Sequence, residues 1–229
     1  MRKYVFEKLA TVDSTNDYLT REVDSGKIKT DKLLVARKQT NGHGQNDRKF
    51  ISDDNVGIYF TLLHFYEDES ELKFITQKVA VAVYTYFKDI FDIEFQIKWV
   101  NDLYYNSKKV CGILCRNLIK YKAVIIGIGI DLFENENINE DIKDIAGCIF
   151  KNKNELIEKL ENNVSKDSID YKKLCEDFEN DTQWEPDSIV DGIVQNIYEL
   201  IKTEGLPQLY VDKNIIKDKR VYEDFNLEC

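Results

Sequence analysis

The sequence predicts an α+β fold, with helices packed on one face of a mixed, largely antiparallel sheet. Three strand-like runs, over 94–100, 109–119 and 122–132, are separated by short turn segments at 106–108 and 120–122, so adjacent hairpins are expected. Between residues 71 and 91, apolar side chains recur at the three- and four-residue spacing of an amphipathic helix. Hairpins and a helix that must bury an apolar stripe combine in α+β layer architectures.

Further elements follow from local composition in the first half of the chain. Asp13-Ser14-Thr15-Asn16 has the chemistry of a helix N-cap, because serine, threonine and asparagine side chains accept hydrogen bonds from free N–H groups. Residues 33–37 and 56–65 are rich in apolar, β-branched and aromatic side chains, which favours strands. The helix over 71–91 is indicated by the apolar residues Leu72, Ile75, Val79, Val83, Tyr86 and Ile90.

The composition changes at residue 133, where asparagine, glutamate, aspartate and lysine become frequent. Apolar residues at helical spacing predict helices over 154–163, 168–179 and 187–202, with Gly205 as a C-terminal stop. The last stretch is expected to hold one strand around 214–216. These boundaries predict a core over 1–132, a helical completion of the same domain over 133–205 and a short C-terminal remnant over 206–229.

Composition also limits the function classes. The 229 residues carry a net charge of -10, so a broad nucleic-acid surface, which needs clustered lysine and arginine, is not expected. The sequence has no signal peptide and no run of about 18 apolar residues, which predicts a cytoplasmic protein without a membrane anchor. The five cysteines lack paired spacing, which favours small apolar core residues over disulfides or zinc ligands.

Two polar blocks precede residue 51. Ser14-Thr15-Asn16 can bind a polar ligand head as well as cap a helix, and a simple cap is the alternative. The block over 39–50 contains Gly42 and Gly44, which allow a ligand to approach the backbone closely, and Arg48-Lys49, which can hold a phosphate or carboxylate. A solvated loop is the alternative interpretation of this block.

Two further blocks lie in predicted strands. Residues 98–114 place basic side chains and the Asn101-Asp102 pair around a hairpin, an arrangement suited to an anionic ligand. Ordinary solvated side chains are the alternative. Residues 124–131 form a mostly apolar strand with Gly127 and Gly129 in its interior, and such glycines weaken a sheet unless a group packs close to the backbone. Glycines that merely mark a bulge are an equal alternative.

In their order, the four blocks resemble the catalytic domain of biotin protein ligases over residues 5–132, of the type without an N-terminal DNA-binding domain. The motifs are Ser-Thr-Asn, Gln-x-x-Gly-x-Gly, Lys-Trp-x-Asn-Asp with Lys-Lys-Val-x-Gly-Ile-Leu, and Gly-Ile-Gly-Ile. The resemblance implies that biotin and MgATP form biotinyl-5′-AMP, which then biotinylates the ε-amino group of a lysine. The implied partner is the biotin carboxyl carrier domain of a biotin-dependent carboxylase.

The resemblance also implies roles for individual residues. Lys109 would lie between the biotin carboxylate and the α-phosphate and, with Arg48, would be catalytic. Asp102 would hold Mg²⁺. The implied biotin contacts are Ser14, Thr15, Asn16, Gln39, Gly42, His43, Gly112, Leu114 and Gly127. The implied nucleotide contacts are Arg48, Lys49, Phe50, Lys98, Asn101, Asp102 and Asp131.

Several residues depart from the family pattern. The loop that usually reads Gly-Arg-Gly-Arg-x-Gly-Arg has His43, Gln45 and Asp47 at its first arginine, second arginine and third glycine. The loss of these cations predicts slower adenylation or a leakier intermediate. Arg116 stands where an acidic residue is common, and Asp131 replaces the usual asparagine.

Two alternatives stay open. The lost loop arginines suggest a non-catalytic homologue that binds biotin or biotinyl-AMP, and a ligase for another acyl group, such as lipoate, would share the fold. The small C-terminal β-barrel of the family is expected to be truncated or absent, and residues 133–186 match no family feature. A homodimer is left undecided, since an exposed sheet edge allows one.

Overall fold

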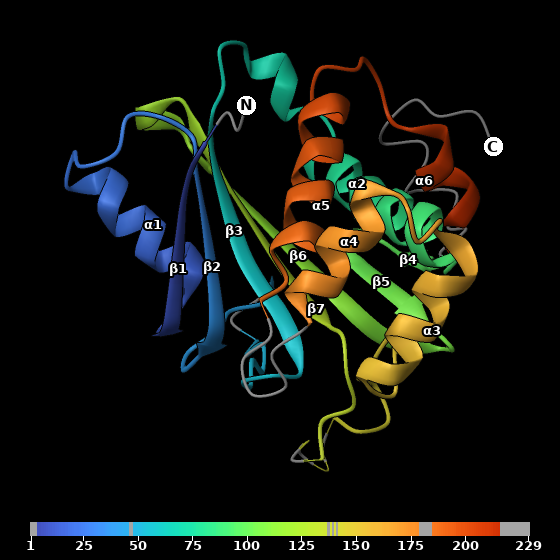
Figure 1. Ribbon diagram of the computed structural model, residues 1–229. Coiled ribbons are helices and arrows are strands. Elements are labelled where there is room, and N and C mark those ends of the chain that lie inside the picture. The colour runs from blue at the N-terminus through green and yellow to red at the C-terminus, as the bar shows by residue number, and fades with distance from the viewer. Residues whose placement is uncertain are drawn as a thin grey trace.

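A single seven-stranded sheet forms the centre of the computed structural model, which describes residues 4–45, 48–136, 138, 140, 142–178 and 185–215. The strands are β1 (Val5–Val12), β2 (Lys32–Gln39), β3 (Gly57–Phe65), β4 (Gln96–Lys98), β5 (Asp102–Tyr105), β6 (Lys108–Leu118) and β7 (Ala123–Asp131). Their order across the sheet is β1-β2-β3-β7-β6-β5-β4 (Figure 1). Only β1 and β2 run parallel, so the predicted mixed, largely antiparallel sheet is confirmed.

Tight turns produce the central hairpins as predicted. Asn106 and Ser107, between β5 and β6, have positive φ angles of 49° and 65°, which is the geometry of a two-residue hairpin turn. The 3₁₀ turn η3 (Ile119–Tyr121) joins β6 to β7. The predicted strand over 94–100 is shorter than expected, because the chain turns after Lys98 and returns as β5, a strand that the sequence did not predict.

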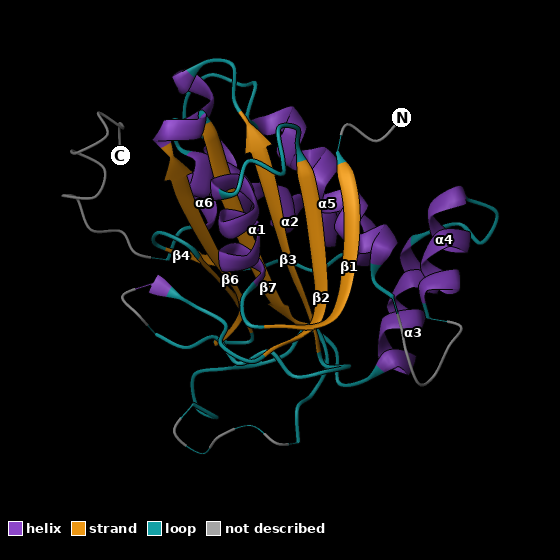
Figure 2. Cartoon of the chain, turned by 90° about the vertical axis from the view of Figure 1, so that its left-hand side faces the viewer, coloured by secondary structure: helices purple, strands orange, loops and turns teal. Residues whose placement is uncertain are grey.

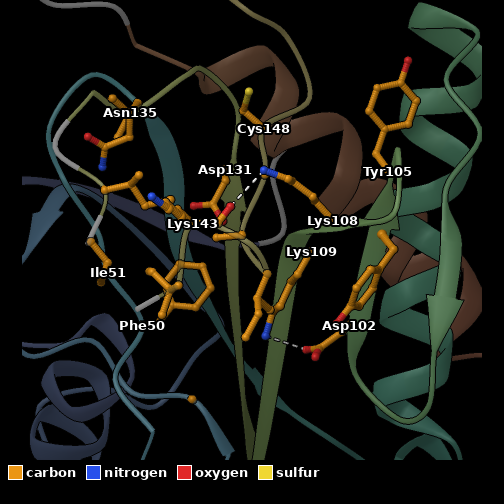
Figure 3. A pocket seen from close by; sticks show the side chains of 18 of the residues that line it. Phe50, Ile51, Asp102, Tyr105, Lys108, Lys109, Asp131, Asn135, Lys143 and Cys148 are labelled. Carbon is orange, nitrogen blue, oxygen red and sulfur yellow. Dashed lines mark hydrogen bonds and ion pairs between the residues drawn. The ribbon is translucent and has the colours of Figure 1, made fainter. Parts of the chain in front are cut away.

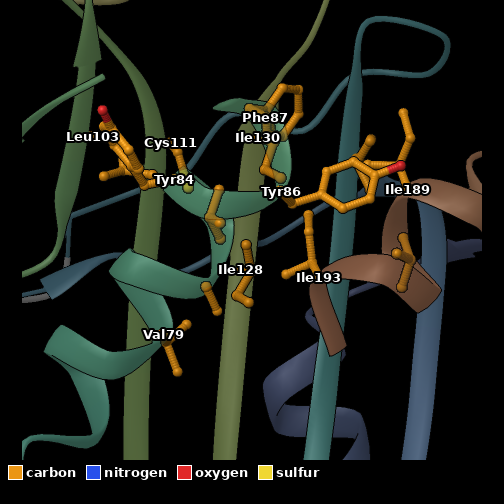
Figure 4. Packing of buried hydrophobic residues seen from close by; sticks show 14 of the residues in the cluster. Val79, Tyr84, Tyr86, Phe87, Leu103, Cys111, Ile128, Ile130, Ile189 and Ile193 are labelled. Atoms are coloured by element: carbon orange, nitrogen blue, oxygen red, sulfur yellow. The ribbon is translucent and has the colours of Figure 1, made fainter. Parts of the chain in front are cut away.

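One face of the sheet is covered by α2 (Ile75–Phe91), α3 (Lys153–Asn163), α4 (Ile169–Asp177), α5 (Asp187–Leu200) and α6 (Gln208–Lys213). The main hydrophobic core lies between this layer and the sheet, where Val79 and Phe87 of α2 meet Ile128 of β7 and Ile193 of α5 (Figure 4). Each of these side chains is almost fully buried. Burying each large apolar side chain stabilises the folded state by about 1.5–3 kcal/mol, so this layer is the main source of stability.

The remaining long helix, α1 (Thr15–Asp24), lies on the opposite face of the sheet (Figures 1 and 2). Its Leu19 and Val23 pack against Leu34, Leu63 and Ile125 in a second, smaller core. The prediction of helices on one face therefore applies to the large layer and does not extend to α1. The N-terminus of α1, capped by Ser14, is consequently held against the sheet.

Two predicted boundaries differ from the structure. The helix expected over 71–91 begins at Ile75, because Asp68 caps a separate 3₁₀ turn, η2 (Glu69–Leu72), and Phe74 takes a φ of 59°. The strand expected around 214–216 is a single bridge between Asn214 and Ile97, and residue 216 lies outside the described residues. Within the described part of the chain, no helix is both long and apolar enough to cross a bilayer.

Candidate active site

Two adjoining cavities open at the sheet beside β6 and β7. The larger has a volume of about 660 Å³ and the smaller about 40 Å³. Gly44, Phe50, Asn101 and Lys109 line both cavities. These four residues therefore form the boundary between two binding volumes.

The smaller cavity is bordered by a hydrogen-bonded polar cluster at the N-terminus of α1. Gln39 Oε1 accepts from the Thr15 backbone N–H at 2.9 Å and from the Thr15 hydroxyl at 3.1 Å. The Thr61 hydroxyl donates to Asn16 Oδ1 at 2.6 Å, and Asn16 Nδ2 donates to the Leu114 carbonyl at 3.4 Å. The cap and the ligand-binding interpretations of Ser14-Thr15-Asn16 are therefore compatible, because the cap itself lies in the cavity wall.

The strand glycines of β7 are sites of close approach. A Cβ at Gly127 would lie 2.2 Å from Asn16 Oδ1, and one at Gly129 would lie 2.4 Å from the Phe50 ring. The pairing of β7 with β3 and β6 runs through both glycines without a register shift, so the bulge alternative is excluded. Side chains from α1 and from the loop after β2 occupy the space that the glycines leave open.

Lys109 reaches the cavities through an irregularity in the sheet. The pairing of β5 with β6 shifts register between Leu103 and Tyr104, after which Lys109 and Gly112 lie on the same side of β6 although they are three positions apart. Lys109 Nζ is 2.7 Å from Asp102 Oδ1 (Figure 3). Both side chains are about three-quarters buried, so neither is an ordinary solvated group.

Every residue that the sequence predicted to contact the nucleotide lines the larger cavity. Its lining includes Arg48, Lys49, Phe50, Lys98, Asn101, Asp102 and Asp131. Asn101 also has a structural role, since its Nδ2 donates to the Ile113 carbonyl at 3.0 Å and its own carbonyl accepts from the Ile113 N–H at 2.9 Å. These bonds fix the turn between β4 and β5 against β6.

Asp131 places a carboxyl group at the end of β7, inside the larger cavity (Figure 3). Burial raises the pKa of this carboxyl to about 7, and the nearby Lys109 ammonium opposes the shift. The group therefore changes charge near neutral pH, where an asparagine would remain neutral.

No group of three or more histidine, cysteine, aspartate or glutamate side chains forms a metal cage within the described ranges. A Mg²⁺ ion that arrives with phosphates needs only one or two carboxylates, because phosphate oxygens and water supply the other ligands. Asp102 and Asp131 both line the larger cavity and fit that donor chemistry. Asp102 would share its carboxylate between such an ion and Lys109.

Two residues that the sequence predicts to depart from the family pattern contact α1, one from the loop after β2 and one from β6. His43 Nε2 is 3.0 Å from Asp17 Oδ2, and Arg116 Nη1 is 3.3 Å from Asp17 Oδ1. Asp17 therefore contacts the side chains at both position 43 and position 116. Gly42 lies behind the cavity wall, where its carbonyl accepts from the Phe50 N–H at 2.9 Å, so it shapes the loop and does not line the smaller cavity. Asp47 lies outside the described residues.

Sequence reasoning missed two parts of the site. Thr61 and Tyr59 lie in β3, and a polar Thr61 at the centre of a fully buried strand is the signal that could have identified the first. The other part consists of described residues of the segment over 133–148, which wall the larger cavity and include Phe133, Lys143 and Cys148. Its polar composition indicated only helix or loop.

The segment over 133–148 is fixed to β6 by backbone bonds. The Lys109 N–H donates to the Ile145 carbonyl and the Gly147 N–H donates to the Lys109 carbonyl, each at 2.8 Å. Lys108 Nζ donates to the Lys143 carbonyl at 2.9 Å. A Cβ at Gly147 would lie 2.6 Å from Lys108 Cβ, so a glycine permits this contact.

Known proteins match this chain over its first part. Residues 9–131 match the sequence model of the Biotin/lipoate A/B protein ligase family. The Bifunctional ligase/repressor BirA of Bacillus subtilis is 33% identical over 132 residues, which are 56% of this chain and 41% of that protein. Biotin–protein ligase 2 of Arabidopsis thaliana is 28% identical over 146 residues, 59% of this chain and 44% of that protein. The chain spans less than half the length of these curated relatives.

Solved structures extend the likeness to most of the chain. The biotin protein ligase of Aquifex aeolicus in complex with biotin and ATP superposes with a TM-score of 0.60 at 26% identity, covering 86% of this chain and 70% of that one. The biotin protein ligase of Leishmania major with biotin has a TM-score of 0.62 at 17% identity, over 98% of this chain and 83% of that one. The second comparison concerns the fold alone.

Proposed function

The chain belongs to the biotin/lipoate A/B protein ligase family, and from this premise we propose that it activates biotin with ATP as biotinyl-5′-AMP. It would then transfer the biotinyl group to the ε-amino group of a lysine on a biotin carboxyl carrier domain. The observation that carries this proposal is the position of Lys109, which lines both cavities. From there its ammonium can face a carboxylate in one cavity and a phosphate in the other.

Adenylation requires two anions to approach each other. Two unit charges 4 Å apart repel by about 4 kcal/mol at an effective dielectric constant near 20, so a fixed cation between them lowers the barrier. The biotin carboxylate oxygen would attack the α-phosphorus, and the bond to the bridging oxygen of pyrophosphate would break. Lysine suits this position because its compact charge can follow the migrating negative charge.

The transfer step consumes the mixed anhydride. The unprotonated acceptor amine would attack the biotinyl carbonyl carbon, AMP would leave, and the nitrogen would lose a proton as the amide forms. Lys109 would stabilise the oxygen on which negative charge develops. Asp102, 2.7 Å from Lys109 Nζ, would orient that ammonium and share its carboxylate with the Mg²⁺ that neutralises the ATP phosphates.

The smaller cavity supplies a polar end for the biotin head. Thr15, Asn16 and Gln39 already bond to one another there, so their hydroxyl and amide groups are held in position for a cyclic urea. Gly112 and Gly127 leave room for Phe50, Lys109 and Asn16 to lie close to the strand backbone, so they position the side chains that border this cavity. Arg48 and Lys49 would contact the phosphates from the larger cavity.

Biotin binding requires a rearrangement at the boundary between the cavities. The smaller cavity has only about 40 Å³, whereas pockets for ligands of this size enclose roughly 300–1,000 Å³. The Phe50 ring lies over Gly129 and beside Gly112, so it fills the space between the two volumes. We infer that rotation of Phe50 joins them.

Biotin-dependent exchange between ATP and pyrophosphate tests the proposal, because it reports adenylation without an acceptor. Exchange is expected with the intact chain, and Lys109→Ala should reduce it at least about 100-fold, since a transition-state charge loses its partner. Lys29→Ala removes an exposed lysine and serves as the matched control. Thermal unfolding checks that each variant folds. Folded protein without exchange would overturn the active-ligase proposal.

A second candidate is a protein that binds biotin or biotinyl-AMP without catalysis. It is favoured by one observation, the loop in which Gln45 is neutral and His43 is directed to Asp17. Calorimetric binding of biotin without any exchange activity would establish it. Saturation with lipoate and not with biotin would instead assign the site to another acyl group.

A further inference from the structure

A third cavity, of about 830 Å³, lies between α2, α4 and α5 and shares no described lining residue with the two cavities above. Tyr86 and Ile90 of α2, Leu174 of α4 and Gly192 of α5 form its apolar part. It belongs to the helical segment that the sequence left without a function. The family match ends at residue 131, before α4 and α5 begin.

The charge of this cavity is strongly negative. Two lysines, Lys173 and Lys202, line it together with six carboxylates, Asp170, Glu176, Asp177, Asp187, Asp191 and Glu199. Burial raises the pKa of Asp177 to about 7, and the neighbouring Asp187 adds to the shift. Carboxylates gathered in this way stabilise an incoming cation and are in turn stabilised by it.

Two polar groups in the wall have no hydrogen bond within the described residues, although one of them, the Tyr86 hydroxyl, is not itself fully buried and borders the cavity. The Tyr86 side chain is 8% exposed and its hydroxyl has no hydrogen bond to the described residues, although the ring points from α2 toward α5 (Figure 4). Burial raises the pKa of that hydroxyl, and the charges of Asp177 and Asp170 raise it further. Asp187 Oδ1 is buried and also lacks a hydrogen-bond partner within the described chain. Such groups carry a desolvation cost that a ligand can relieve.

The close packing beneath Tyr86 holds its hydroxyl in place. A Cβ at Gly192 would lie 2.2 Å from the Tyr86 ring, so the ring rests directly on the α5 backbone. Any larger residue at Gly192 would displace the ring. The hydroxyl is therefore positioned by packing and not by a hydrogen bond.

The spacing of the carboxylates indicates which kind of cation this cavity can bind. They do not converge, since no group of three or more forms a metal cage among the described residues. Apolar atoms of Tyr86, Ile90 and Leu174 lie among them. At the edge of the cavity, one alkylammonium group already pairs with carboxylates. Lys8 Nζ lies 2.7 Å from Asp187 Oδ2 and 2.5 Å from Glu185 Oε2.

We propose that this cavity binds an aliphatic di- or polyamine, whose ammonium groups meet the separated carboxylates while its methylenes contact Tyr86, Ile90 and Leu174. The Tyr86 hydroxyl accepts a hydrogen bond from one ammonium group, and Asp177 and Asp170 hold its charge. A lysine side chain of a peptide carries the same alkylammonium chemistry, so the test must separate the two sources. The proposal does not depend on the biotin ligase activity.

Isothermal titration calorimetry with spermidine, at low salt and without biotin or ATP, tests the site. Saturable binding of one spermidine per chain is expected. Asp177→Asn should weaken it at least about tenfold, and Tyr86→Phe about threefold, because each removes one partner of a charged group. Asp89→Asn is the matched control, since Asp89 lies exposed on α2 outside the cavity and loses the same charge. Circular dichroism verifies the fold of each variant.

Several outcomes would overturn the proposal. Absence of saturable binding would do so, and so would equal weakening by Asp89→Asn, which would indicate general attraction to an acidic protein. Mg²⁺ that displaces the dication putrescine at equal concentration would contradict the requirement for an extended cation. Binding of a lysine-containing peptide without binding of spermidine would assign the surface to a protein partner instead.

Discussion

The Asp102 carboxylate can pair with two different cations. It lies 2.7 Å from Lys109 Nζ, and it faces the larger cavity, where a phosphate-bound cation would lie. A phosphate that approaches Lys109 competes with Asp102 for the ammonium, while Mg²⁺ competes with Lys109 for Asp102. Both competitions favour the same rearrangement, in which Mg²⁺ pairs with Asp102 and Lys109 pairs with the phosphate. The pair thereby holds both groups near their proposed positions.

Asp131 gives the site a dependence on pH that the usual asparagine lacks. Its pKa of about 7 lies above the usual range of an aspartate because the group is buried, so the carboxyl is neutral below pH 7 and charged above it. In the absence of Mg²⁺ the charged form repels ATP, so the effect is measured with ATP without the metal. Folding stability is affected in the same direction, since a raised carboxyl pKa contributes stability below the unfolded pKa and loses it as pH rises toward 7.

We predict that ATP binds about threefold to tenfold more weakly at pH 8 than at pH 6, as one added negative charge in the cavity requires. Asp131→Asn should bind ATP with little change across this range. Calorimetric titrations with ATP in the absence of biotin and Mg²⁺ measure the effect. An equal pH dependence in wild type and Asp131→Asn would show that another group is responsible.

At the scale of elements, α5 is anchored to α2 by a buried lysine. Lys78 is almost fully buried, and its Nζ donates to the Thr203 carbonyl at 2.8 Å and approaches the Ile201 carbonyl at 3.4 Å. These carbonyls follow the C-terminus of α5, where a cation is stabilised by the helix dipole. Burial lowers the pKa of Lys78, and the Glu71 carboxylate opposes this shift.

Lys78→Met should lower the free energy of unfolding by about 1–3 kcal/mol, because two carbonyl groups lose their buried donor. Urea titration followed by circular dichroism measures the change. Lys27→Met, at an exposed position beyond α1, should leave stability within about 0.5 kcal/mol. A more stable Lys78→Met protein would mean that desolvation of the ammonium outweighs its two contacts.

The elements that the sequence predicted are those with a strong local signal. The turn at Asn106-Ser107 located the start of β6, although the strand before it, β5, was missed, and apolar spacing identified α2. β1 was missed because Val5–Val12 mixes charged and apolar residues along a half-exposed edge strand. The face on which α1 packs depends on contacts with Leu34 and Ile125, which are distant in sequence and carry no local signal.

At the scale of the whole molecule, the candidate site joins segments that are distant in sequence, and none of its described lining residues belongs to α2–α6. The N-terminus of α1 reaches it from one side, the loop after β2 closes over it, and the segment over 133–148 walls it beyond β7. Motif order located the strand and loop residues, whereas the wall over 133–148 depends on backbone bonds to Lys109 that the sequence does not encode locally. The proposed division of the chain at residue 132 stays a prediction.

A site assembled from so many segments should couple ligand binding to global stability. Biotin at about 100 times its dissociation constant should stabilise the protein by about 2.7 kcal/mol, and biotin with ATP by more. Thermal unfolding with each ligand alone and with both measures this. Lipoate at the same concentration should leave the unfolding temperature unchanged. A larger shift with lipoate than with biotin would contradict the proposed substrate.

The contact of Asp17 with both His43 and Arg116 couples the loop after β2 to β6. One acidic side chain on α1 serves two neighbours, so the residues at 43 and 116 are not independent. An arginine restored at 43 alone would compete with Arg116 for the same carboxylate, and its benefit would emerge only once an acidic residue returned at 116. Substitutions at 17, 43 and 116 are therefore expected to be non-additive, because they share one carboxylate.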